Sequence, residues 1–201
     1  MTDAAQPATV SLATRHVMQA NKSENTGPEL LVRAALRQRG LAGYRIHWKR
    51  AAGKPDVAYP GRRVAIFVNG CFWHRCPRCH PSTPHTNAGF WQEKFARNQR
   101  RDRRNEQILV EQGWTVLVVW ECRLRKRRAA RTMSEVSCEV RLRPSARQRG
   151  QAGTGAPRGA TRAPRVIVMG AGTSCYERAL RLIRRRAARV RAGGVARGRR
   201  G

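Results

Sequence analysis

Apolar residues recur at helical spacing in two parts of the chain. They follow Thr26-Gly27-Pro28-Glu29 at spacings of three and four as far as Gly40. This predicts a helix capped near Thr26, with a proline in its first turn and an acid favoured by the helix dipole. A longer and more polar helix is predicted over residues 90–112, ending at Gly113.

Four runs rich in β-branched and aromatic residues predict strands, at residues 44–48, 56–59, 63–68 and 114–120. The second and third runs are separated by Pro60-Gly61, which predicts a hairpin. The last run is apolar apart from Thr115, as expected for a strand that is covered on both faces. The order of helix, strands, helix and strand predicts a mixed α/β domain.

The pattern changes near residue 130. We predict an N-terminal extension over residues 1–14, a folded domain over 15–130, and a tail over 131–201. The tail is rich in Arg, Ala and Gly and carries half of the net charge in about a third of the chain, which is typical of a disordered basic segment. The run Val166-Ile-Val-Met-Gly looks strand-like, but its glycines are only a weak phosphate-loop signal, and we discount it.

The composition narrows the class of function. The 201 residues carry a formal net charge of +30, and such a basic chain is expected to bind a polyanion, most simply nucleic acid. We expect no membrane-spanning segment, because no stretch reaches about 18 apolar residues. No secretory signal is visible at the N-terminus, so the six cysteines are expected to be metal ligands or free thiols and not disulfides.

Four cysteines have the spacing of a metal site: Cys71, Cys76, Cys79 and Cys122. Thiolates are ligands that Zn²⁺ prefers, and spacing alone favours a structural zinc over a catalytic one. His80 can replace Cys79 as a ligand, and buried free thiols are the plainer alternative. The site would tie the third and fourth predicted strands together at their C-terminal ends.

Acidic residues and histidines supply further candidates. Asp56, at the start of a strand, is either a turn residue or a Mg²⁺ ligand. Asp102 can be a surface ion pair, and Glu29 can be only a helix-start acid. His74, inside the cysteine loop, can be a zinc ligand, a packed side chain or a general base, and His85 is a less supported candidate base.

Three large aromatic residues, Phe72, Trp73 and Trp91, lie in or near this loop and the long helix. Packing in the core is their ordinary role. Apolar side chains can also wedge between base steps and open a duplex, so they are candidate DNA-binding residues.

Together these motifs resemble the very short patch repair (Vsr) endonucleases from about Arg15 to Leu124. The strings that carry the resemblance are Thr-Gly-Pro-Glu29, Gly-Lys-Pro-Asp56-Val, Phe-Val-Asn-Gly-Cys-Phe-Trp-His74, Phe90-Trp91, Lys94, Asn98, Arg101-Asp102, Gly113-Trp114 and Trp-Glu-Cys122. The resemblance implies a restriction-endonuclease-like α/β fold with a structural zinc. It also implies a Mg²⁺-dependent nick on the 5′ side of the thymine in a T·G mismatch, which arises when 5-methylcytosine deaminates.

Residue roles follow from the same resemblance. Asp56 and the main-chain carbonyl of Val68 would bind Mg²⁺. His74 would be the general base, supported by Asp102, and Glu29 would have a supporting role. The wedge would be Phe72, Trp73 and Trp91, and the zinc ligands would be Cys71, Cys76, Cys79 and Cys122.

Two features depart from the family pattern. Asn69 stands where the family commonly has Asp or His, and a neutral amide can neither act as a base nor add negative charge for a metal. The arginine-rich C-terminus is the second departure. It would either add non-specific, salt-dependent DNA affinity or reflect an altered reading frame in a GC-rich gene.

The implied partners are duplex DNA with a T·G mismatch, mismatch-repair proteins and a cognate cytosine methyltransferase. The implied location is the bacterial cytoplasm, on the nucleoid when DNA is bound. Three rival hypotheses remain: a nuclease of other specificity, a non-catalytic zinc-stabilised DNA-binding protein, and a protein that condenses nucleic acid through its basic tail.

Overall fold

The computed structural model describes residues 24–145 and 163–169, which contain a five-stranded mixed sheet. The strands lie in the order of the chain: β1 (Arg45–Ile46), β2 (Val57–Tyr59), β3 (Val64–Asn69), β4 (Thr115–Trp120) and β5 (Val166–Val168). The first three pair antiparallel, whereas β3–β4 and β4–β5 are parallel. The predicted α/β class and the predicted hairpin between β2 and β3 are therefore confirmed.

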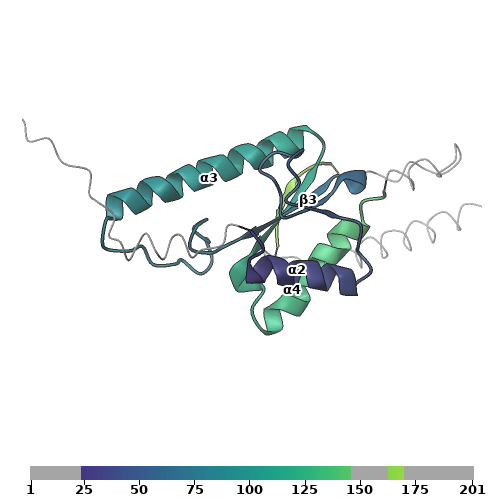
Figure 1. Ribbon diagram of the computed structural model, residues 1–201, viewed down its shortest axis with the longest axis horizontal. Helices are drawn as coiled ribbons and strands as arrows, with labels where there is room; N and C mark the ends of the chain where they lie inside the picture. The colour runs from purple at the N-terminus through teal and green to yellow at the C-terminus, as the bar shows by residue number, and fades with distance from the viewer. Residues whose placement is uncertain (1–23, 146–162, 170–201) are drawn as a thin grey trace, which may run out of the picture.

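Within residues 24–145, three α-helices cover the sheet: α2 (Gly27–Gln38), α3 (Ala88–Glu111) and α4 (Arg127–Arg141). Two 3₁₀ turns, Pro60–Arg62 and Glu121–Arg123, follow β2 and β4. In Figure 1, α2 and α4 lie together on one side of the sheet and α3 runs along the other. Because α3 connects two parallel strands, it must cross over one face of the sheet.

Two hydrophobic cores lie on opposite faces of the sheet, because side chains alternate along each strand. In β3, Val64 and Ile66 pack with α2 and α4, while Ala65 points into the core under α3. Every residue of β4 is buried. This agrees with the prediction of a strand covered on both faces.

The start of α2 is fixed by a capping box. The Thr26 side chain and the Glu29 side chain each satisfy backbone groups of the first turn, and Pro28 needs no hydrogen bond there. This cap brings the buried carboxylate of Glu29 to the end of the helix that faces the sheet.

The prediction of a disordered tail from residue 131 is wrong for two elements. Helix α4 crosses the proposed boundary and buries Met133, Val136 and Val140 in the core that it shares with α2. The discounted run forms β5, which pairs with β4. These apolar residues contact a surface that is built by distant parts of the chain, so local composition hid them. Residues 146–162 and 170–201 of the predicted tail, and the extension over residues 1–14, lie outside the described residues.

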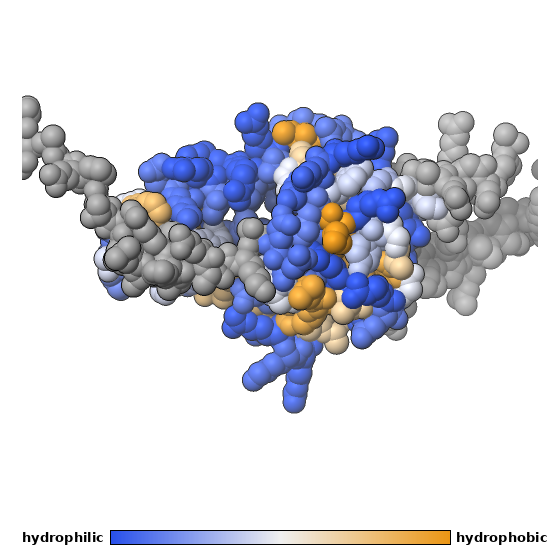
Figure 2. Space-filling view, in the orientation of Figure 1, coloured by the Kyte–Doolittle hydropathy of each residue, from blue (hydrophilic) through white to orange (hydrophobic). Residues whose placement is uncertain are grey.

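The exposed surface is mainly polar, and Figure 2 shows apolar atoms as separate patches on a largely hydrophilic face. Among described residues, the exposed large apolar side chains are Leu30, Leu31, Ile46, Phe90, Leu142, Val166 and Val168. Helices long and apolar enough to span a bilayer do not occur in the described part of the chain.

Candidate active site and metal centre

A pocket of about 790 Å³ lies where the capped end of α2, the start of β2, the end of β3 and the middle of α3 meet. It brings together seven of the residues predicted from sequence: Glu29, Asp56, Val68, Asn69, Trp73, His74 and Asp102. Residues that are 73 positions apart in the chain therefore share one cavity. The predicted residues Phe72, Trp91 and the four cysteines lie outside its lining.

Asp56 is a half-buried carboxylate that lines this pocket. It precedes β2, and its Oδ2 accepts a hydrogen bond of 2.7 Å from the backbone N–H of Val68 on β3. Burial raises the pKa of Asp56 from its ordinary value of 3.8 to about 6, although the Val68 hydrogen bond opposes the shift. A half-buried carboxylate in need of a counter-charge fits a divalent cation, and carboxylate and carbonyl oxygens are the ligands that Mg²⁺ prefers.

His74 and Asp102 form a direct pair across the pocket, with 2.5 Å between His74 Nδ1 and Asp102 Oδ2. An ionised carboxylate can only accept, so Nδ1 carries the hydrogen and Nε2 keeps its lone pair. The loop that carries His74 is attached to α3 by a second contact, in which the Asn98 amide donates to the Trp73 carbonyl at 3.1 Å. An imidazole oriented by a carboxylate is suited to accept a proton.

The four predicted thiols form one cluster. The sulfur atoms of Cys71, Cys76, Cys79 and Cys122 all lie within 4.8 Å of one another. Cys71 follows β3 and Cys122 follows β4, so the parallel pairing brings these two ends together, as the sequence predicts. The group contains Cys79 and not the alternative ligand His80.

The thiols fit a tetrahedral metal ion in spacing and in chemistry. A Zn–S bond of about 2.3 Å requires sulfur atoms about 3.8 Å apart in a tetrahedron, and Cys76 and Cys122 are 3.8 Å apart. Burial raises the pKa of Cys71 and of Cys122, so a cation is needed to hold them as thiolates. Zn²⁺ would serve this cluster as a structural ion.

The predicted wedge residues pack against one another. The Phe72 ring lies 5.0 Å from Trp73, 5.4 Å from Trp91 and 5.2 Å from Phe95, each in an edge-to-face contact. Trp91 and Phe95 are buried, whereas Phe72 and Trp73 are partly exposed. In this state the aromatic residues form a small core between the cysteine loop and α3.

Comparisons with known proteins relate this chain to DNA endonucleases. Residues 5–79 match the family model described as DNA mismatch endonuclease Vsr. A Xanthomonas oryzae protein, Type II nicking enzyme V.XorIIP, is 41% identical over 110 residues, which are 55% of this chain and 80% of that protein. DNA mismatch endonuclease Vsr of Escherichia coli is 40% identical over 55% of this chain and 70% of its own length.

The chain belongs to the Vsr family. A further relative, Type II nicking enzyme V.NaeI of Lentzea aerocolonigenes, is 42% identical over 57% of this chain and 71% of its own length. The family predicted from the motif strings is therefore confirmed.

In this Vsr-family chain, Asn69 is buried at the end of β3 and lines the pocket. The position that the resemblance marks as a departure from the family pattern therefore lies inside the site. Residue 69 can still donate or accept hydrogen bonds, but it adds no negative charge beside Asp56.

Sequence reasoning missed His47, which lines the pocket, and Arg33, which contacts His47. Arg33 is buried one turn after Glu29, and its Nη2 lies 2.8 Å from both Glu29 Oε2 and His47 Nε2. The predicted strand over residues 44–48 contains His47, but only the folded structure shows that His47 Nδ1 lies 3.9 Å from Asp56 Oδ1.

Proposed function

We propose that this Vsr-family protein is a Mg²⁺-dependent endonuclease that nicks one strand of duplex DNA on the 5′ side of the thymine in a T·G mismatch. The observation that carries the proposal is the shared pocket, in which the half-buried Asp56 lies with the paired His74 and Asp102. Family membership supports the reaction class, DNA endonuclease hydrolysis.

Each pocket residue has a defined task in this proposal. Asp56 and the main-chain carbonyl of Val68 would hold Mg²⁺, whose chemistry is to neutralise charge on the scissile phosphate and the leaving oxygen. His74 Nε2 accepts a proton from the attacking water. Asp102 keeps the imidazole in the required tautomer and stabilises the imidazolium that forms.

DNA recognition would use the surface around the pocket. Exposed arginines of α3, such as Arg97 and Arg101, supply phosphate contacts. Phe72, Trp73 and Trp91 would leave their mutual contacts to wedge beside the mismatch, where unstacking costs less than in a matched duplex. The zinc cluster would hold the loop that carries Phe72, Trp73 and His74.

The proposed setting is very short patch repair, in which T·G pairs arise from deaminated 5-methylcytosine. A cognate cytosine methyltransferase would define the sites, and mismatch-repair proteins would act alongside. The enzyme would work in the bacterial cytoplasm, on the nucleoid when bound to DNA.

A nicking assay tests the proposal. The zinc-loaded protein is incubated with Mg²⁺ and an end-labelled T·G duplex, with the matched T·A duplex as control. We expect a single nick 5′ of the thymine in the mismatched duplex only, and no nick with Asp56→Ala or His74→Ala, both of which should still bind the DNA. Equal cutting of both duplexes would contradict the proposed mismatch specificity, and absence of cutting would contradict the proposed nicking activity.

One alternative function is a mismatch-binding protein without catalysis. Asn69 supports it, because this neutral residue lines the pocket at a position where the family commonly has Asp or His. This alternative expects tight binding to the T·G duplex at any Mg²⁺ concentration and no nick. Restoring the acid with Asn69→Asp would then be the informative variant, since recovered nicking would trace the loss to this residue.

A further inference from the structure

We infer that His47, held in one tautomer by Arg33, is a positioning residue that orients the metal-binding carboxylate of Asp56. The inference rests on the proposed Mg²⁺ site at Asp56. It concerns two residues to which the sequence motifs assign no role.

The backbone places His47 close to Asp56. Strands β1 and β2 pair antiparallel, with Arg45 opposite Ala58 and Ile46 opposite Val57. The ladder ends there, and His47 and Asp56 are the residues that directly follow β1 and precede β2, with His47 Nδ1 3.9 Å from Asp56 Oδ1. His47 has a φ of +43°, in the left-handed region that a non-glycine residue rarely adopts, so the surrounding contacts must hold it there.

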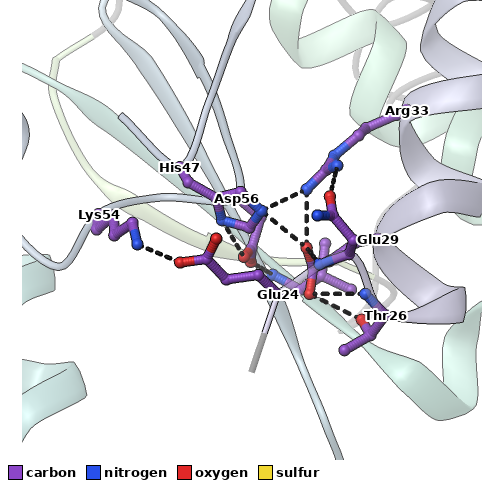
Figure 3. Close-up of polar contacts among 9 residues, drawn as sticks. Glu24, Thr26, Glu29, Arg33, His47, Lys54 and Asp56 are labelled. Atoms are coloured by element: carbon purple, nitrogen blue, oxygen red, sulfur yellow. Dashed lines mark hydrogen bonds and ion pairs between the residues drawn. The ribbon is translucent and has the colours of Figure 1, made fainter. Parts of the chain in front are cut away.

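The Arg33 guanidinium fixes the hydrogen on the His47 ring. Its Nη2 lies 2.8 Å from His47 Nε2, and a guanidinium has only donors. The Nε2 atom must therefore be the acceptor, and the ring hydrogen lies on Nδ1. His47 Nδ1 faces Asp56 Oδ1 at 3.9 Å, a separation that one bridging water can span. Figure 3 shows His47 between Arg33 and Asp56.

Arg33 is itself held rigidly. Its Nη1 donates to Asn25 Oδ1 at 2.6 Å, and its Nη2 also donates to Glu29 Oε2 at 2.8 Å. Glu29 accepts further hydrogen bonds from the backbone N–H of Asn25 and from the Thr26 hydroxyl. The capped end of α2 is thereby connected to the ring of His47.

Both oxygens of Asp56 then have a defined neighbour. Oδ2 accepts from the Val68 N–H at 2.7 Å, and Oδ1 faces the N–H of His47. Rotation of the carboxylate would break the Val68 hydrogen bond and would move Oδ1 away from His47 Nδ1. Groups that orient a metal ligand in this way typically change metal affinity by about 10- to 100-fold when they are removed.

The ligand atoms of Glu29, His47 and Asp56 also lie within 4.8 Å of one another, so His47 could instead be a direct metal ligand. The Arg33 guanidinium argues against this arrangement. It bonds to both Glu29 and His47 and supplies the positive charge that a second cation would otherwise provide.

The test compares His47→Leu with His47→Gln, two substitutions at the same left-handed backbone position. Leu has no donor or acceptor, whereas Gln keeps an amide donor for Asp56 and a carbonyl acceptor for Arg33. His47→Ala is a second non-polar variant that adds no volume, in case Leu disturbs folding. Arg37→Met is the matched control, because Arg37 lies one turn further along α2 and contacts Tyr44, away from the pocket.

The readout is binding of Mn²⁺ to the zinc-loaded full chain, followed by electron paramagnetic resonance, since Mn²⁺ takes the same hard oxygen ligands as Mg²⁺. We expect His47→Leu and His47→Ala to bind Mn²⁺ about 10-fold more weakly. His47→Gln should recover most of this affinity, and Arg37→Met should match the wild type. The melting temperature and the zinc content should be the same in the wild type and in these variants.

The outcomes separate this inference from the proposed function. Wild-type affinity in both non-polar variants, while the wild type nicks and binds Mn²⁺, overturns the positioning role alone. Loss of a whole bound ion in His47→Gln would make His47 a ligand and also overturn it. A wild-type protein that binds no Mn²⁺ at Asp56 overturns both proposals.

Discussion

Asp56→Asn should stabilise the Mg²⁺-free protein while abolishing nicking. The Asp56 side chain is 20% exposed, and burial raises its pKa from 3.8 to about 6. At neutral pH, keeping this group ionised in the folded state costs at most about 3 kcal/mol relative to the unfolded chain. Asparagine removes the charge, and its side-chain oxygen can still accept the Val68 hydrogen bond.

The sign of the pH dependence follows from the raised pKa. The folded protein holds a proton on Asp56 at pH values where the unfolded chain has released it. The stability that this proton contributes is fully present below pH 3.8 and is lost as the pH rises through about 6. The advantage of Asp56→Asn should therefore be largest above pH 7 and should shrink as the pH falls towards 5.

Urea unfolding of zinc-loaded protein, without added Mg²⁺ or chelator, measures this difference between pH 5 and pH 8. Adding Mg²⁺ should stabilise the wild type and leave Asp56→Asn unchanged, because ligand that binds only the folded state adds to its stability. The reasoning is refuted if the variant is less stable than the wild type at pH 7.5, or if the difference does not change with pH.

Three other predictions test separate parts of the molecule. Asp102→Asn should lower the single-turnover nicking rate by about 100-fold with unchanged DNA binding, since His74 loses its orienting partner; an unchanged rate would exclude that role. Cys122→Ser should reduce bound zinc, measured by metal analysis, and lower the melting temperature; full zinc content with wild-type stability would contradict a structural site. Met133→Ala should cost about 2–5 kcal/mol in urea unfolding, against about 0.5 kcal/mol or less for the exposed Arg128→Ala. Equal effects would mean that α4 is not part of the core.

Local patterns were enough to predict most of the fold. The helical spacing after Thr26, the Pro60-Gly61 turn and the apolar run before Trp120 each depend on neighbouring residues, and the corresponding elements are present. Tying Cys71 to Cys122 needed only the assumption that two buried strands run parallel, which the β3–β4 register confirms.

Helix α4 and strand β5 were missed because their stability comes from distant contacts. In α4 only one side is apolar, at Met133, Val136 and Val140, and the arginines of its exposed side dominate the composition. Strand β5 has three residues and two exposed side chains, Val166 and Val168, so it is recognisable only through its pairing with β4.

The candidate site could be predicted as a set of residues, and its geometry could not. Motif resemblance selected Asp56, His74 and Asp102, but their proximity depends on how α3 crosses the sheet. The role inferred for His47 depends on strand register and on a left-handed backbone angle, and neither leaves a signal in local sequence.

The parallel pairing of β3 and β4 also has a consequence for the order in which the chain is made. Three cysteines of the cluster leave the ribosome with residues 71–79, but the fourth, Cys122, follows only after α3 and β4 have been synthesised. The loop that carries His74 cannot be closed by a four-thiol site before that point. If the proposed zinc site closes this loop, a nascent chain would lack the closed loop until nearly all of the sheet has been made.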